Sequence, residues 1–285
     1  LCLVLLTFAI GVTQVFCMFI HALSRVPFAA VPMDSSLPLL VALSMGFGCA
    51  LWILWPLKIT RKLIAGIVSL FCLFVAISFA PWYGTSITMI DVGQGDAFLV
   101  KSNNQTLLID TGYQSKKLYS GLARSGITHL DAILITHADS DHCGALRDLK
   151  GIVRCDRVIL AEGMQNVNDD NTRELIDDAI YLVGASNVTY IKAKDTISLD
   201  TVSFTVLSPE NLNDAGGNQD SICCLLCIDS NQDSIVDWTG LFCGDAEAQT
   251  LEPLVNKYQI EHIDILKVSH HGAKASLTDS LIEKL

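Results

Sequence analysis

The sequence predicts a group of transmembrane helices followed by an α+β sandwich built from layers of sheets and helices. Residues 1–85 contain only four basic side chains and one acidic side chain, although 17% of the 285 residues are charged. From Ser86 onward, short β-rich runs alternate with turn residues and amphipathic stretches. Strands in runs with interspersed helices are typical of α+β layer architectures. We therefore expect a membrane segment over residues 1–82 and a separate domain over 86–285.

The membrane segment contains three uncharged apolar runs, over residues 1–20, 37–57 and 63–80. Each is close to the roughly 20 residues that a helix needs to cross a bilayer. We expect about three spans. The alternative, that these runs are buried core helices, fits poorly with three of them in so short a segment.

A basic loop between the second and third runs predicts the topology. This loop contains Lys58, Arg61 and Lys62, and cytoplasmic loops are enriched in Lys and Arg. One further span then places residues 86–285 on the extracellular face of the cell membrane. The chain begins with Leu and its end, "SLIEKL", has no stop signal, so we expect a longer protein and a C-terminally truncated domain.

The expected elements of the second domain follow from local patterns. Short β-rich runs bounded by Gly, Asn and Asp predict strands; apolar residues at helical spacing, followed in one case by Gly184, predict helices. The predicted strands cover 86–92, 97–102, 105–112, 130–135, 157–162, 188–193, 202–209, 221–229, 234–245 and 262–272, and the predicted helices cover 116–125, 169–185 and 246–258.

Three predicted strands end in side chains that can bind a metal ion. The first is followed by the H-x-D-x-D-H motif of "THADSDHCGAL"; the second ends at Asp245 in "LFCGDAE", and the third at His270 and His271 in "LKVSHHGAK". Neighbouring carboxylates repel each other unless a cation lies between them. Imidazole and carboxylate together suit zinc, manganese or iron. Strand ends of one sheet meet at one edge, so these groups predict a metal site.

Each group also has an ordinary structural interpretation. The H-x-D-x-D-H motif could be a polar loop, and Asp245 could cap the helix that follows it. His270 and His271 could form a surface turn that ends at Gly272. The occurrence of all three in this order favours the metal site.

The motifs "DVGQGDA", "LLIDTG", H-x-D-x-D-H, "GDAE" and "LKVSHHG", in this order, resemble the metallo-β-lactamase superfamily. The chain as a whole resembles the ComEC family of competence proteins, DNA-uptake channels that join a membrane domain to such a domain. The resemblance implies an αββα sandwich and one or two divalent ions, zinc or manganese. It also implies DNA, the lipid bilayer and other competence proteins as partners, and a homo-oligomer is possible.

The resemblance also implies a role for individual residues. His137 and Asp139 would bind a first ion, Asp141, His142 and His271 a second, and Asp245 would bridge the two. The candidate catalytic residues are His270, which would face the substrate as an electrophile or proton donor, and Asp141. Carboxylates at further strand ends would support the ligands from behind; these are Asp91, Asp96 and Asp110. Asp91 and Asp110 could instead shape turns before Gly.

One departure concerns the first ion. The superfamily usually supplies a histidine between the main motif and the bridging Asp, but residues 143–261 contain none. Asn218 and Ser221 match the residues of the resembled family there, as possible first-site or substrate contacts. Because Asn is a poor substitute for imidazole, we expect the first ion to be bound more weakly.

The reaction implied is hydrolysis of DNA phosphodiesters. Residues 1–85 hold four of the 19 basic and one of the 30 acidic residues, which leaves 15 basic and 29 acidic residues for the second domain. DNA binding depends on Lys and Arg contacts to phosphate, so this acidity leaves two alternatives open. The domain could hydrolyse a smaller phosphodiester, or it could be a non-catalytic module of a DNA channel. A β-lactam substrate is disfavoured because the usual H-x-H is absent.

Overall fold

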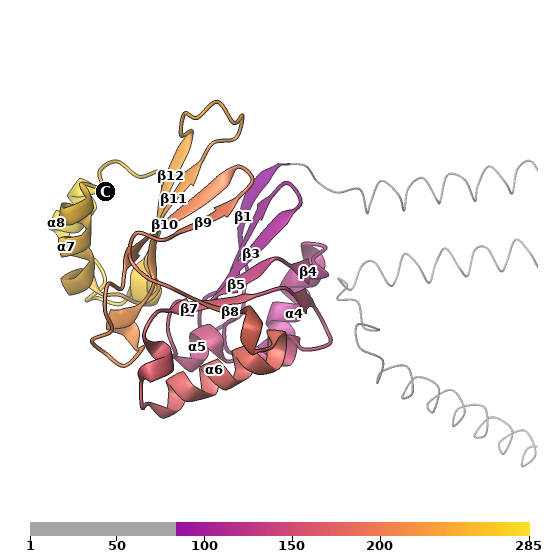
Figure 1. Ribbon diagram of the computed structural model, residues 1–285. Coiled ribbons are helices and arrows are strands. Elements are labelled where there is room, and N and C mark those ends of the chain that lie inside the picture. The colour runs from indigo at the N-terminus through magenta and orange to yellow at the C-terminus, as the bar shows by residue number, and fades with distance from the viewer. Residues whose placement is uncertain (1–83) are drawn as a thin grey trace, which may run out of the picture.

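The structure, a computed structural model, describes residues 84–285 (Figure 1). The predicted spans, the basic loop and the membrane domain over 1–82 lie outside the described residues. Within 84–285, no helix combines the length and the apolar character needed to cross a membrane.

The first sheet has six strands in the order β1-β2-β3-β5-β7-β8. Its first three strands form antiparallel hairpins, and the pairs from β3 to β8 are parallel. Parallel neighbours need a crossover, and the helices between these strands supply it. The strands are β1 (Thr85–Met89), β2 (Phe98–Ser102), β3 (Gln105–Ile109), β5 (Ala132–Leu134), β7 (Val158–Ala161) and β8 (Val188–Ile191).

The second sheet has five strands in the order β13-β12-β11-β10-β9. They are antiparallel except for β12 and β13, which are parallel and are connected by a helix. The strands are β9 (Thr196–Leu199), β10 (Val202–Ser208), β11 (Cys223–Ile228), β12 (Trp238–Phe242) and β13 (Ile265–Lys267). A two-stranded sheet pairs β4 (His129–Leu130) with β6 (Arg154–Cys155).

The helices cover the outer faces of the two sheets. Figure 1 shows α4 (Ser115–Arg124), α5 (Ser140–Cys143) and α6 (Asp170–Val183) along the first sheet, and α7 (Ala248–Tyr258) and α8 (Asp279–Lys284) beside the second. The expected ends of α6 are present: the Asp169 side chain accepts a hydrogen bond from Thr172 N, and Gly184 follows with a φ of 85°. The architecture is therefore helix, sheet, sheet, helix.

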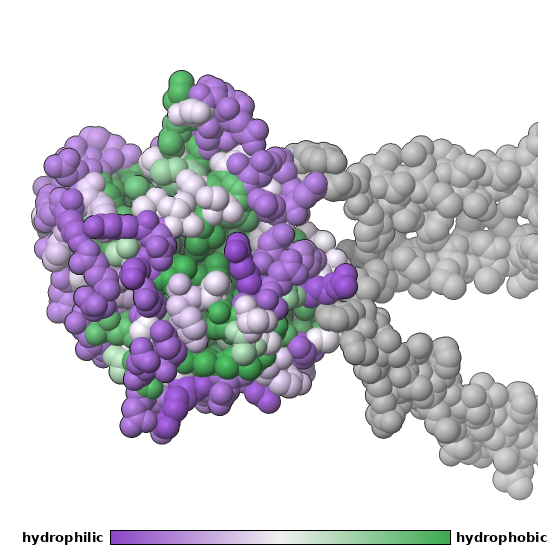
Figure 2. Space-filling view, viewed as in Figure 1, coloured by the Kyte–Doolittle hydropathy of each residue, from purple (hydrophilic) through white to green (hydrophobic). Residues whose placement is uncertain are grey.

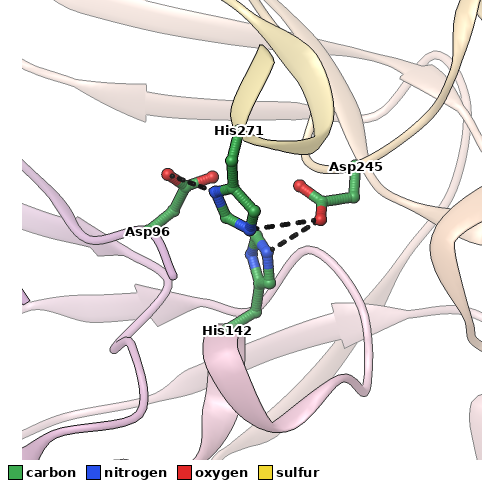
Figure 3. Close-up of side chains that lie close together, drawn as sticks. All are labelled: Asp96, His142, Asp245 and His271. Atoms are coloured by element: carbon green, nitrogen blue, oxygen red, sulfur yellow. Dashed lines mark ion pairs between the residues drawn. The ribbon is translucent and has the colours of Figure 1, made fainter. Parts of the chain in front are cut away.

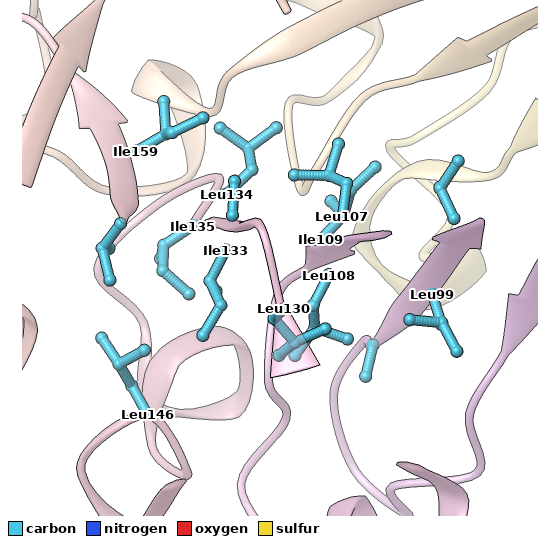
Figure 4. Packing of buried hydrophobic residues seen from close by; sticks show 14 of the residues in the cluster. Leu99, Leu107, Leu108, Ile109, Leu130, Ile133, Leu134, Ile135, Leu146 and Ile159 are labelled. Carbon is cyan, nitrogen blue, oxygen red and sulfur yellow. The ribbon is translucent and has the colours of Figure 1, made fainter. Parts of the chain in front are cut away.

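The core lies on both faces of the first sheet and between the sheets. The central parallel strands β5 and β7 are apolar throughout, as strands buried on both faces are; Figure 4 shows Ile133 and Leu134 of β5 beside Leu107 and Leu108 of β3. Between the sheets, Phe242 packs edge-on against Phe98 and Phe204, with ring centroids 5.4 and 5.8 Å apart. This packing fixes the two sheets relative to each other.

Apolar surface remains beside the edge strands. Figure 2 shows apolar residues in the middle of the displayed face, with hydrophilic residues around them. A hollow of about 640 Å³ is lined by Ile87, Met89, Phe242 and Ile265, and by His271 at one end.

Two predicted strands are shorter than expected. The strand predicted over 234–245 begins only at Trp238, since a loop precedes it, and ends at Phe242. The strand predicted over 262–272 ends at Lys267, and Ser269–Gly272 form a short helical turn. In that turn His270 and His271 both adopt left-handed backbone angles, with φ of 47° and 51°. The prediction that an extended strand carries the two histidines is therefore wrong.

Candidate metal centre

The H-x-D-x-D-H motif turns from a strand into a short helix. β5 ends at Leu134, and α5 begins at Ser140, where Asp139 takes the N-cap position. Thr136 O accepts a hydrogen bond from Ile222 N, and Ala138 N donates to Gly216 O. These bonds tie the loop to the second half of the domain. His137 and His142 are fully buried as a result.

Asp110 holds His142 in one orientation. Its Oδ2 atom lies 2.8 Å from His142 Nδ1, and its two oxygens accept hydrogen bonds from Thr136 N and Thr136 Oγ1, both 2.8 Å long. Carboxylates that bind the far nitrogen of a ligand imidazole fix its orientation and raise its basicity. His142 Nε2 consequently faces Asp245 Oδ2, 3.2 Å away.

His271 is held in the same way from the opposite side. Its Nδ1 atom lies 3.5 Å from Asp96 Oδ1, and its Nε2 atom lies 3.3 Å from Asp141 Oδ2 and 3.5 Å from Asp245 Oδ2. Figure 3 shows the two imidazoles meeting at Asp245. Two histidines and two carboxylates thus direct ligand atoms into one space.

Asp96 was predicted to support the ligands from behind, and it lies among them. Asp96, His142, Asp245 and His271 offer ligand atoms that all lie within 4.8 Å of one another. Asp96 reaches this position because the "GQGD" turn packs directly against the motif: Asp96 N donates to Asp141 O, and a Cβ at Gly95 would lie 1.7 Å from that oxygen. Only glycine fits at position 95.

Asp245 is positioned by its neighbours on both sides. Its backbone N donates to Ser221 Oγ at 3.0 Å. The preceding Gly244 has a φ of 51°, and a Cβ there would lie 2.8 Å from Ser221 Cβ. Ser221, predicted as a first-site or substrate contact, therefore has a structural role in holding Asp245.

Lys267 contacts the centre and Glu247 contacts the neighbouring His270, and neither was predicted. Lys267 is buried at the end of β13 and forms ion pairs with Asp96 and, at 3.4 Å, with Asp245. Glu247 Oε1 lies 3.2 Å from His270 Nδ1. A lysine at the end of an otherwise apolar strand, and the Glu of "GDAE", were the available signals.

His270 and His271 diverge. Their ring centroids lie 6.3 Å apart with an angle of 77° between the planes. His270 turns to Glu247 and His271 to the centre. The divergence comes from the left-handed turn and not from strand alternation.

Opposite charges shift the ionisation of these groups. Burial alone would lower the pKa of His142, but the Asp110 carboxylate, followed by Asp245, outweighs it and raises the pKa to about 10. Burial would raise the pKa of Asp245, yet His142 and then Lys267 hold it well below its usual range. The pKa of Lys267 is raised because Asp96 and Asp245 outweigh its burial. Positive and negative side chains therefore already lie close together in the centre before any cation binds.

The donor set fits a divalent ion. Within residues 84–285 the buried Nε2 atoms of His137 and His142 make no hydrogen bond; each has only a carboxylate nearby, that of Asp139 at 3.7 Å and that of Asp245 at 3.2 Å. An unpaired buried polar atom is costly, and a metal ion would satisfy it. Histidine with carboxylate is a suitable ligand set for zinc or manganese.

The side expected to hold the first ion is less complete. His137 Nδ1 lies 3.1 Å from Thr136 Oγ1, and its Nε2 lies 3.7 Å from Asp139 Oδ2. The Asp139 side chain is 43% exposed. Asn218 Oδ1 is buried without a hydrogen-bond partner, which leaves it available as a weak ligand.

Asp91 lies apart from the ligand cluster. Its exposed carboxylate accepts a hydrogen bond from Gly93 N and lies 3.6 Å from Lys117 Nζ. This arrangement favours the alternative in which Asp91 shapes its turn. Asp110, in contrast, occupies the predicted position behind a ligand imidazole.

Known proteins share these motifs. The sequence profile of the metallo-beta-lactamase superfamily matches residues 90–171. The chain is similar to ComE operon protein 3 of Bacillus subtilis (strain 168), with 30% identity over 219 residues, which make up 70% of this chain and 27% of that protein. It is also similar to Recombination protein 2 of Haemophilus influenzae, with 27% identity over 220 residues, or 75% of this chain and 24% of that protein.

A third relative is Competence protein ComA of Neisseria gonorrhoeae, with 26% identity over 200 residues, or 69% of this chain and 25% of that protein. The chain spans about a quarter of the length of these curated relatives. The chain therefore belongs to the ComEC family of competence proteins, and its C-terminal part is a domain of the metallo-beta-lactamase superfamily.

Proposed function

We propose that residues 86–285 form a metal-dependent hydrolase that cleaves DNA phosphodiesters, as the extracellular domain of a membrane-anchored DNA-uptake channel. One observation carries the proposal. His142 Nε2, His271 Nε2, Asp141 Oδ2 and Asp245 Oδ2 converge, with separations of 3.2 to 3.5 Å among the pairs in contact. Asp110 Oδ2 lies 2.8 Å from Nδ1 of the first imidazole, and Asp96, itself a candidate ligand, has Oδ1 3.5 Å from Nδ1 of the second.

The chain supplies the positioning, and the ions supply the activation. Divalent ions bound here would lower the pKa of a water molecule and stabilise negative charge on a phosphate oxygen. Asp141, His142, Asp245 and His271 would hold one ion; His137 and Asp139, with Asp245 shared, would hold the second. Asp110 keeps His142 in its orientation throughout.

His270 would donate a proton to the leaving oxygen. Its side chain is 34% exposed, so its free nitrogen is accessible to a substrate. Glu247 lies 3.2 Å from Nδ1 and would accept its proton in a hydrogen bond, so His270 would act as a proton donor in its imidazolium form, with the second proton on Nε2 given to the leaving oxygen. A general acid or base needs this fixed geometry.

The other parts of the proposal rest on family membership and sequence. The predicted spans in residues 1–82 would anchor the domain to the lipid bilayer, and the basic loop would place it outside the cell. DNA and other competence proteins are the proposed partners, and a homo-oligomer would form the channel. The acidic balance of the domain supports a smaller phosphodiester as the second candidate substrate.

The test combines metal content with turnover. The purified chain is loaded with Mn²⁺ or Zn²⁺, desalted, analysed for metal, and assayed on bis(p-nitrophenyl) phosphate and on single- and double-stranded DNA. His271→Ala should lose the more tightly bound ion and all detectable hydrolysis. The matched control is His262→Asn, because His262 is exposed and Asn tolerates its left-handed backbone. This variant should retain the tightly bound ion and the hydrolytic activity.

Each outcome separates the candidates. Cleavage of DNA supports the proposal, whereas turnover of the small diester without DNA cleavage supports the second candidate. If the wild type binds metal but turns over neither substrate, the hydrolase proposal is rejected and the non-catalytic module is the remaining alternative.

A further inference from the structure

Lys267 lies between the two carboxylates that flank the candidate metal centre. Its side chain is 6% exposed. The ammonium donates to Gly244 O at 2.7 Å, pairs with Asp245 Oδ1 at 3.4 Å and pairs with Asp96 Oδ2. A lysine ammonium has three donors, and here all three have partners. Lys267 is therefore not free to bind a substrate.

In each of the two carboxylates, one oxygen contacts Lys267 and the other contacts histidine. Asp245 presents Oδ1 to Lys267 and Oδ2 to His142 and His271. Asp96 presents Oδ2 to Lys267 and Oδ1 to His271. Only Oδ2 of Asp245 remains for a metal ion, although bridging two ions was its expected role.

The charge of Lys267 has a second effect. A fixed positive charge beside Asp245 repels a further cation bound to that carboxylate, and this repulsion is strong in a buried site. Without Lys267, Asp96 Oδ2 and Asp245 Oδ1 would be two buried carboxylate oxygens with no cation near them, which is an unfavourable arrangement unless a metal ion enters.

We propose that Lys267 is a positioning residue that occupies the place of a second cation on Asp245, so that the centre retains one ion tightly. This inference rests on the proposed metal centre. It adds a second cause, besides the missing histidine, for a difference in affinity between the two ions. It also predicts that the affinity for the second ion increases when the charge of Lys267 is removed.

The test counts ions in the full chain with Mn²⁺ as the probe. Wild type, Lys267→Met and Lys267→Arg are purified with Mn²⁺ present, passed through a desalting column and analysed for manganese. The matched control is Lys274→Met, which removes an exposed lysine close to the His270–His271 turn. Wild type, Lys267→Arg and Lys274→Met should each retain one ion.

Lys267→Met should retain two ions, with the affinity for the second increased by about tenfold or more. Its melting temperature should also rise more on addition of Mn²⁺ than that of the wild type, because binding to the folded state alone stabilises it. Retention of one ion with wild-type affinity, or of none, overturns the proposal.

A measurement on the wild type remains informative if Lys267→Met does not fold. Release of two ions at the same chelator concentration from the wild type would also overturn the proposal. A wild type that retains no ion at all rejects the metal centre itself, which is the failure of the proposed function.

Discussion

On one side of the centre, Asp110 holds His142 and Asp96 holds His271, and both imidazoles meet Asp245. On the other side, His137 has a hydroxyl behind it, Asp139 is partly exposed, and Asn218, the residue that the resemblance matches to a position between the main motif and Asp245, has a buried side-chain oxygen without a hydrogen-bond partner in residues 84–285. One six-residue motif contributes candidate ligands to both sides. Because the neighbours outside the motif differ between the two sides, we expect the two ions to be bound with different affinities, for reasons that lie outside the motif.

The largest effect should come from separating ligand from proton donor. His270→Ala should keep the wild-type metal content and slow the hydrolysis of DNA by about 10²–10⁴-fold, the range for loss of a general acid. The loss should shrink for bis(p-nitrophenyl) phosphate, whose leaving group needs no proton. Steady-state rates and elemental analysis on the same sample test this. If His270→Ala loses the metal and His271→Ala keeps it, the two roles are reversed.

A smaller effect should follow from weakening the well-supported side. Asp110→Asn removes the charge behind His142 and should lower the affinity for the tight ion by about 10–100-fold. Competition with a chromophoric chelator measures the change. Asp91→Asn is the control, since Asp91 contacts a turn and Lys117. Equal losses in both variants would show that the position of the carboxylate is unimportant.

The smallest effect should follow from completing the weaker side. Asn218→His places an imidazole near His137 and should raise the affinity for the loose ion by roughly tenfold or less, because a new buried ring must repack. The wild type should lose its loose ion first as chelator increases, and Asn218→His should bring the two release steps closer together. Unchanged release would mean that position 218 does not reach the ion.

Local sequence patterns were sufficient for much of the fold. The apolar strands β3, β5 and β7 and the capped helix α6 lie where their patterns predict them, because each pattern reflects burial or capping within a few residues. The turn at His270 and His271 was not predictable, because the left-handed angles depend on bonds to a distant loop, such as that from Ser269 Oγ to Ala246 O.

The residues of the candidate site also fall into two groups, those that the sequence predicts and those that only the fold reveals. His142, His271 and Asp245 were predicted because their residue types are typical of metal ligands. Lys267 and Glu247 were missed because their roles depend on which side chains face them across elements far apart in the sequence. Ser221 was named as a possible first-site or substrate contact, and the sequence did not predict the hydrogen bond that its Oγ accepts from Asp245 N.

The candidate metal centre lies where the two sheets meet, and this has a consequence for the order of events during synthesis. Asp110 and His142 follow strands of the first sheet, whereas Asp245 and His271 follow β12 and β13 of the second. Neither sheet alone holds the complete ligand set. A ribosome releases the first sheet well before His271 emerges, so a nascent chain cannot capture the tight ion until the sheets have docked. An ion bound there would then cross-link the two halves, and metal uptake would report the final step of folding.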